Sequence, residues 1–276
     1  MLKQRVITGV ILAAVALAAV LWLPPLPLAL LLGLAVLMAL WEWGALAALR
    51  APARVVYCAT GVAAMVALAL GGGLLEAAPR AAVADGVFTV AALWWVVALL
   101  WVVGFPASAE RWGSTPMRAA MGYLALLPAW FALLYLRELP QGIGLILFLV
   151  ALVACADIGA YFSGRALGRR KLAPRVSPGK SWEGFWGGLA CSLVFAAVVW
   201  WLAWAQRIGL PALLLVALAT AMASVLGDLV ESMVKRQRGV KDSGSLLPGH
   251  GGVMDRLDSL SAAAPVFALG LSLAQW

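Results

Sequence analysis

Carboxylates, bases and glycines gather near the C-terminal end of the chain, between Ser232 and Asp258. Asp255 and Asp258 are three residues apart, a spacing that places two side chains on one face of a helix. Carboxylates suit Mg²⁺, which binds through one or two of them together with substrate phosphates. Asp228, at the end of the preceding apolar segment, is a third candidate. An isolated D-x-x-D pair more often decorates a surface helix, but the glycines, histidine and bases in front of this pair favour a ligand site. We therefore expect Asp228, Asp255 and Asp258 to bind metal.

A glycine-rich turn, Gly249-His250-Gly251-Gly252, directly precedes the two aspartates. Glycines let the backbone approach a ligand closely, and N–H groups at a helix start form a natural phosphate site. We expect His250, the single histidine of the chain, to shape a phosphate pocket with Gly251 and Gly252. A hydrogen-bonded loop histidine and a flexible turn remain the alternatives.

Basic residues flank this turn, and their side chains are suited to clamp a polyphosphate. Their alternative role is to mark the cytoplasmic side of a membrane, and the two roles are compatible. The bases expected to hold phosphates are Lys180, Lys235, Arg236, Lys241 and Arg256.

A second polar motif spans residues 177–184, and its Gly179-Lys180-Ser181 resembles the end of a P-loop. Position 174, where the P-loop requires its first glycine, is proline, so we reject that assignment. Ser177 and Lys180 remain candidates for substrate binding. Asp157 lies inside an apolar run, where a carboxylate is costly and should face a polar cavity or a cation.

The elements that must position these residues are membrane helices. The 276 residues are 64% hydrophobic and 12% charged, with a mean hydropathy of +0.99. Runs long enough to cross a bilayer recur, and predict an all-α polytopic membrane protein with about nine transmembrane helices. The expected spans are 6–23, 26–49, 55–75, 86–105, 119–136, 142–163, 185–205, 210–232 and 260–275. Within one membrane domain, residues 1–140 are expected to be scaffold and residues 141–276 catalytic. The first span is expected to stay uncleaved.

The distribution of basic residues predicts the orientation. With the N-terminus in the cytoplasm, the expected spans leave only Arg80, Arg137 and Arg207 of the 20 basic residues outside. This asymmetry follows the positive-inside rule, and it places both polar loops, about 164–184 and 233–259, in the cytosol. The net charge of +8 is then explained by topology and phosphate binding, and nucleic acid is not an expected partner.

The cysteines give no sign of a metal site or a disulfide. Cys58, Cys155 and Cys191 lie in apolar runs without metal-ligand spacing. We interpret them as small buried apolar residues.

The polar block closely resembles the phosphatidate cytidylyltransferase (CDP-diacylglycerol synthase) family. The matching residues are Ser232, Val234, Lys235, Arg236, Lys241, Asp242, Gly244, Leu247, Pro248, His250, Gly251, Gly252, Val253, Asp255, Arg256, Leu257 and Asp258. Further matches upstream are Asp157, Ala160, Tyr161, Gly164, Arg165, Ser177, Pro178, Lys180, Ser181, Glu183, Gly184, Gly227 and Asp228. The N-terminal half matches in hydrophobicity and at Glu42, which we otherwise interpret as an interfacial residue between Trp41 and Trp43.

The resemblance implies transfer of CMP from CTP to phosphatidate, giving CDP-diacylglycerol and pyrophosphate. It also implies Mg²⁺, with K⁺ as a second ion, and a homodimer among the lipids of a bacterial inner membrane. Asp228, Asp255, Asp258, Lys241 and His250 would then be catalytic. The expected substrate-binding residues are Asp157, Ser177, Lys180, Lys235, Arg236, Gly251, Gly252 and Arg256.

Other functions remain open. A CTP-dependent lipid kinase of the dolichol or phytol kinase type would release CDP instead of pyrophosphate. A CDP-alcohol phosphotransferase requires an Asp-Gly-x-x-Ala-Arg pattern that the chain lacks. A transporter should show repeat symmetry and polar groups near the bilayer midplane, whereas these polar groups gather at one face.

Overall fold

The computed structural model describes residues 2–74, 79–246 and 251–276, with side chains from Thr8 onward. Helices dominate this part of the chain. They are α1 (Leu2–Trp22), α2 (Pro25–Leu46), α3 (Ala51–Gly71), α4 (Ala81–Val103), α5 (Ala109–Trp112), α6 (Thr115–Glu138), α7 (Gly142–Leu167), α8 (Trp182–Val199), the π-helical turn η2 (Trp200–Trp204), α9 (Leu210–Gln237) and α10 (Met254–Leu273).

Seven of the described helices are long and apolar enough to cross a membrane: α2, α3, α4, α6, α7, α8 continued by η2, and α9. The chain is therefore a polytopic helical membrane protein. By length and hydropathy, the described helices thus give seven membrane spans, fewer than the expected number of about nine. The apolar part described in α1, Thr8–Trp22, is shorter, and α10 begins with a turn that contains Asp255, Arg256 and Asp258.

The two helices that contain the polar block are longer than expected. Helix α9 continues to Gln237, past the predicted end at 232, and α10 begins at Met254, before the predicted start at 260. Lys235 and Arg236 therefore extend from the last turns of α9. Asp255 and Asp258 lie in the first turns of α10, as their spacing predicts.

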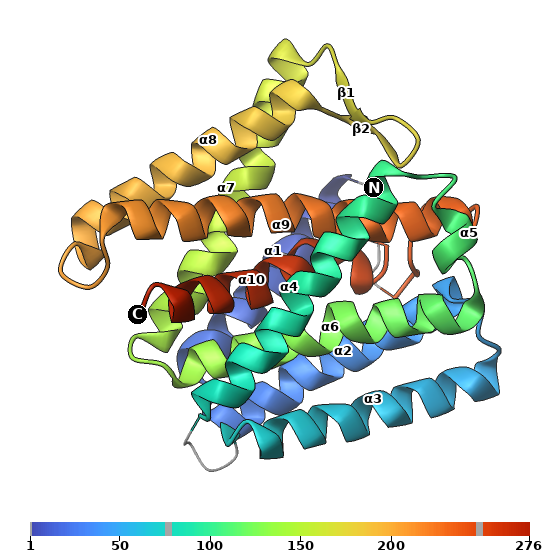
Figure 1. The fold of residues 1–276 in the computed structure, drawn as a ribbon, viewed down its shortest axis with the longest axis horizontal. Helices are drawn as coiled ribbons and strands as arrows, with labels where there is room; N and C mark the ends of the chain where they lie inside the picture. Colours follow the sequence, from blue (N-terminus) through green and yellow to red (C-terminus); the bar gives the residue numbers. More distant parts are fainter. Residues whose placement is uncertain (1, 75–78, 247–250) are drawn as a thin grey trace.

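A small antiparallel hairpin occupies the first polar loop, where the sequence predicts no strand. Strand β1 (Lys171–Ala173) pairs with β2 (Ser177–Ser181), with Lys171 opposite Ser181 and Ala173 opposite Ser177. Residues 174–176 form the turn between the strands. Figure 1 shows the hairpin at the far end of α7 and α8, which project beyond the other helices.

Helices α9 and α10 lie side by side across the centre of the molecule, and α2, α3 and α6 form the layer below them in this view (Figure 1). Gly227 allows the close approach of α9 to α10, because a Cβ there would collide with the carbonyl oxygen of Asp258. Aromatic side chains fill the core between α4 and α6, where the rings of Phe88 and Phe131 are 5.8 Å apart. The close approach of α9 and α10 at Gly227 fixes the relative positions of the carboxylates on these two helices.

Candidate active site

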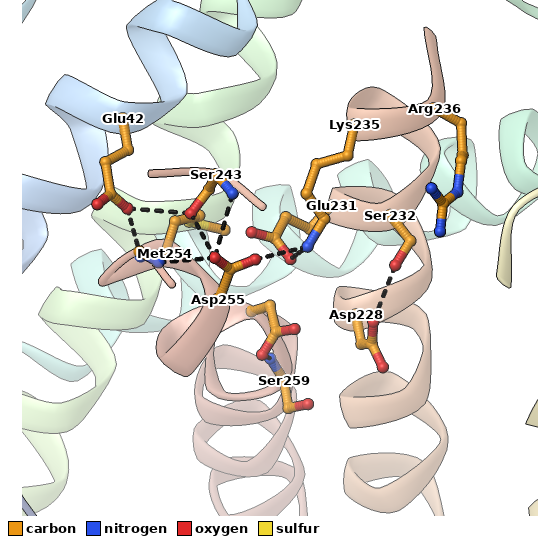
Figure 2. Close-up of polar contacts among 12 residues, drawn as sticks. Glu42, Asp228, Glu231, Ser232, Lys235, Arg236, Ser243, Met254, Asp255 and Ser259 are labelled. Carbon is orange, nitrogen blue, oxygen red and sulfur yellow. Dashed lines mark hydrogen bonds and ion pairs between the residues drawn. The ribbon is translucent and has the colours of Figure 1, made fainter. Parts of the chain in front are cut away.

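Lys235 lies between two carboxylates at the junction of α9 and α10 (Figure 2). Its Nζ is 2.7 Å from Oε2 of Glu231, one turn earlier on α9, and 2.6 Å from Oδ1 of Asp255 on α10. Glu231 is fully buried and Lys235 is nearly so. A buried charge is tolerated when it is paired and hydrogen-bonded. The ion pair between Lys235 and Asp255 therefore holds α9 and α10 together. The Lys235 ammonium already has two carboxylate partners within the protein.

Asp255 also organises the loop between α9 and α10. Its Oδ2 accepts hydrogen bonds from the backbone N–H of Gly252 at 2.8 Å, and from the N–H and Oγ of Ser243 at 3.1 and 3.0 Å. Burial raises the pKa of Asp255, but the hydrogen bonds from Lys235, Gly252 and Ser243 outweigh this effect and hold the pKa below its ordinary value. Both of its oxygens are therefore engaged within the protein.

Glu42 reaches this loop from α2, in the N-terminal half of the chain (Figure 2). Its carboxylate accepts hydrogen bonds from the N–H groups of Val253 and Met254, at 3.1 and 2.9 Å, and from Oγ of Ser243 at 3.1 Å. These N–H groups begin α10 and have no partner within that helix. Only 3% of Glu42 is exposed, so its carboxylate is engaged within the protein and serves the start of α10.

The glycines of the turn have a packing role beside these carboxylates. A Cβ on Gly252 would collide with Oγ of Ser243 and Oε2 of Glu42. Gly251 has a φ of +80°, and a Cβ there would lie 2.8 Å from Oδ2 of Asp255. Such a φ is readily adopted only by glycine. The predicted site residue His250 lies outside the described residues.

Asp228 joins α9 to the hairpin. Its Oδ2 lies 2.6 Å from Nζ of Lys180 on β2, and its Oδ1 accepts a hydrogen bond of 3.1 Å from Oγ of Ser232. Asp157 on α7 is near enough to both Lys180 and Asp228 for their charges to interact. Charged and polar side chains from α7, β2 and α9 thus lie close together: Asp157, Lys180, Asp228 and Ser232.

Asp258 faces the same place from α10. Burial, and then the neighbouring carboxylate of Asp228, raise the pKa of Asp258 to about 7. Asp258 Oδ1 accepts a hydrogen bond from the N–H of Ser259 at 2.7 Å. Two carboxylates that repel one another beside a helix junction form an electrostatically strained pair, which a cation would relieve.

The three predicted metal ligands are not brought together as one set. Among the described residues, no group of three or more His, Cys, Asp or Glu side chains is placed to hold a metal ion. Asp255 is engaged with Lys235, Ser243 and Gly252, so both of its oxygens already have partners within the protein. The Asp228–Asp258 pair still fits Mg²⁺, which needs one or two protein carboxylates when phosphates and waters complete its shell.

The hairpin contacts the end of α9 through Arg236, whose Nε donates a hydrogen bond of 3.1 Å to the carbonyl of Val176. Ser177 is partly exposed on the same strand as Lys180, and Lys241 and Arg256 are exposed near the two ends of the α9–α10 loop. Ser181 caps α8 by accepting the N–H of Gly184 at 3.1 Å. Of the predicted bases, Lys180 and Lys235 are thus paired with carboxylates, and Lys235 alone among the five is buried.

Sequence reasoning did not assign Glu42, Glu231 or Ser243 to the site, although Glu42 was noted as a match to the family. A carboxylate inside an apolar helix is costly, and this signal is present for Glu42 as it is for Asp157. The spacing of Glu231 and Lys235, four residues apart on a helix, also indicates a pair. Ser243 has no comparable signal, because its role depends on contacts with residues distant in the sequence.

The model of the cytidylyltransferase family matches residues 3–274. The chain belongs to this family. It is 49% identical over 277 residues to the phosphatidate cytidylyltransferase of Pseudomonas aeruginosa, which covers 100% of this chain and 99% of that protein. With the phosphatidate cytidylyltransferase of Haemophilus influenzae the identity is 41% over 281 residues, covering 97% and 98%.

The resemblance drawn from the C-terminal motifs is confirmed, and the family relationship extends through the N-terminal half. The phosphatidate cytidylyltransferase of Brucella suis is 51% identical over 139 residues, which is 47% of each chain.

Proposed function

We propose that this chain is a nucleotidyltransferase that transfers CMP from CTP to phosphatidate, giving CDP-diacylglycerol and pyrophosphate for phospholipid synthesis. The observation that carries the proposal is the full-length similarity to proteins of that name, at 49% and 41% identity. The bases and carboxylates gathered at one end of a membrane bundle are suited to a triphosphate and a lipid phosphate.

The reaction needs positioned phosphates more than a strong base. A phosphate oxygen of phosphatidate attacks the α-phosphorus of CTP, and a new P–O bond forms as the bond to the β-phosphate oxygen breaks. The electron pair of that bond leaves with pyrophosphate. The nucleophile is already anionic, so catalysis reduces to alignment and charge neutralisation. Lys180, Arg236, Lys241 and Arg256 are the side chains we assign to the phosphates.

Lys180 is the best placed of these bases. Its side chain is 26% exposed and its ammonium is paired with Asp228, which is 31% exposed. Because the pair is open to solvent, an incoming phosphate can compete with Asp228 for the ammonium at low cost. Asp157, whose charge interacts with both, is positioned to hold Lys180 during this exchange.

The metal site we propose is the Asp228–Asp258 pair, with Mg²⁺ as its ion and K⁺ as a second ion beside it. A bound Mg²⁺ would neutralise charge on the phosphates and help to fix their geometry. Asp255 belongs to the positioning framework in this proposal. It aligns the loop that contains His250 through its contacts with Lys235, Ser243 and Gly252. Glu42 supports the same loop from α2.

In the proposed topology the chain crosses a bacterial inner membrane about nine times, because α1 and α10 are added to the seven apolar spans. The N-terminus and the polar site face the cytoplasm, as the distribution of basic residues favours. CTP then enters from the cytosol and phosphatidate from the bilayer. We also propose that the enzyme works as a homodimer surrounded by membrane lipids.

The test is to give purified, detergent-solubilised protein CTP, Mg²⁺ and phosphatidate, and to measure pyrophosphate while identifying the lipid product by mass. Pyrophosphate together with CDP-diacylglycerol is the expected result. CDP with a newly phosphorylated lipid would replace the proposal by a lipid kinase. No turnover by folded protein would favour a transporter or an inactive relative.

A further inference from the structure

A deep apolar groove lies between α2, α3 and α6, and extends along α2 from Pro25 to Leu37. Its volume is about 830 Å³, within the range of small-molecule pockets. Leu30 and Leu34 of α2, Met65 and Val66 of α3, and Trp130 of α6 line its length. Leu30 is 67% exposed and Leu34 49% exposed, so the wall includes large apolar side chains without a protein partner over much of their surface.

The polar end of the groove is far from the candidate active site, although its apolar wall extends along α2 to Leu37. Helix α2 runs from Pro25 at the groove to Glu42 at the site, and these 17 residues correspond to about 25 Å along a helix. Helix α6 runs in the opposite direction, from Arg118, whose carbonyl accepts a hydrogen bond from Trp43 near the site, to Arg137 at the polar end of the groove. A headgroup at the polar end of the groove therefore lies at the other end of these helices from the candidate active site.

One end of the groove contains a base and an acid side by side. Arg137 and Glu138, the last residues of α6, both line it. The Nε of Arg137 is buried and has no hydrogen-bond partner among the described residues. A buried donor without a partner costs free energy that an incoming acceptor would recover. The position is therefore prepared for a ligand oxygen.

The two charges define the ligand. A purely anionic headgroup would gain from Arg137 but be repelled by Glu138. A headgroup with a phosphate and a primary amine matches both, because the guanidinium binds phosphate strongly and the carboxylate accepts hydrogen bonds from an ammonium. We propose that this groove binds a phospholipid of the phosphatidylethanolamine type, with an acyl chain along α2 and α3. This site is independent of the catalytic reaction proposed above.

The proposal is tested by native mass spectrometry of the delipidated full-length protein, titrated separately with phosphatidylethanolamine, phosphatidylcholine and phosphatidylglycerol of identical acyl chains. One phosphatidylethanolamine should bind about tenfold more tightly than either other lipid, equivalent to about 1.4 kcal/mol. Equal binding of all three would overturn the proposal and leave only non-selective lipid contact. A preference for phosphatidylglycerol or phosphatidylcholine would also overturn it.

Variants separate the groove from other lipid contacts. Arg137→Gln should weaken binding of all three lipids, and Glu138→Gln should remove the preference for phosphatidylethanolamine. Gly33→Leu should block the groove, because a Cβ at Gly33 meets Trp130 Nε1 at an ordinary 3.6 Å and the longer side chain extends into the space.

The matched controls are Arg207→Gln, which changes another base outside the groove lining, and Gly86→Leu, where a Cβ has no neighbour within 4 Å among the described residues. Both controls should bind lipid like the unmodified protein. Pyrophosphate release by every variant monitors its folding. If Gly33→Leu remains active and still binds phosphatidylethanolamine selectively, the groove is not the site and the proposal fails.

Discussion

Glu42 accepts a hydrogen bond of 2.9 Å from the backbone N–H of Met254, a residue 212 positions later in the chain. This contact places a carboxylate from the second helix at the first turn of the last one. A negative charge there also interacts favourably with the dipole of α10. The N-terminal half is thus part of the framework that holds the candidate active site.

Replacement of Glu42 by alanine should leave the N–H groups of Val253 and Met254 without a buried acceptor. The expected cost is about 1–3 kcal/mol of stability, together with at least a tenfold loss of turnover. Thermal unfolding and pyrophosphate release check both effects. Glu42→Gln should be intermediate, because one oxygen acceptor remains.

Glu110→Gln is the matched control, because Glu110 is an exposed acid on α5. It should behave like the unmodified protein in both assays. Normal activity and stability of Glu42→Ala would show that the cap is dispensable.

Replacement of Lys235 by methionine should destabilise the protein strongly. Two buried carboxylates would lose their shared cation, and breaking a buried ion pair on one side costs about 3–5 kcal/mol. The double variant Lys235→Met with Glu231→Gln should recover part of the lost thermal stability, because one of the uncompensated charges is removed. Absence of any recovery would contradict the pairing of Glu231 with Lys235.

Lys180 should matter for catalysis much more than for stability. Its ion pair with Asp228 is partly exposed, and such pairs contribute about 0–1 kcal/mol. Lys180→Met should therefore unfold near the normal temperature, while its kcat/KM for CTP falls at least tenfold. Steady-state kinetics at varied CTP measure this. Lys171→Met, on the other strand of the hairpin, is the control, and an equal loss in both variants would implicate hairpin stability instead.

The pKa of Asp258 makes the metal-free protein sensitive to pH. An ordinary aspartate has a pKa near 3.9, whereas burial and Asp228 raise that of Asp258 to about 7. The folded protein then holds a proton that the unfolded chain has released, so this carboxyl lowers stability as pH rises from about 4 to about 7. Thermal unfolding in a chelator should show this decline.

Asp258→Asn should reduce that decline and should also abolish Mg²⁺-dependent turnover. In the unmodified protein, Mg²⁺ should raise the unfolding temperature more at pH 7 than at pH 5, because the ion competes with the proton. An identical pH profile for Asp258→Asn and the unmodified protein would exclude Asp258 as the titrating group.

Features that depend on local sequence could be predicted. Apolar runs revealed the membrane helices, and the three-residue spacing of Asp255 and Asp258 placed them in one helix. The turn glycines were also identified, but their observed packing reason differs from the predicted one. They make room for Glu42 and Asp255, whereas the prediction concerned phosphate approach.

Features that depend on tertiary contact could not be predicted in the same way. The hairpin at residues 171–181 is short and mostly polar, so it has no alternating apolar pattern to reveal strands. The engagement of Asp255 with Lys235 and Ser243 arises only when α9 and α10 pack. The interaction of Asp258 with Asp228 has the same origin, because spacing along a helix does not specify the partners on its neighbours.

The contact between Glu42 and the start of α10 also bears on how the protein is made. A ribosome synthesises the chain from its N-terminal end, so α2 must wait for nearly the whole sequence before its carboxylate finds a partner. During that interval Glu42 has no N–H donors from α10, and the loop between α9 and α10 has no support from α2. The site should consequently form only after α10 has been synthesised and has packed against α2.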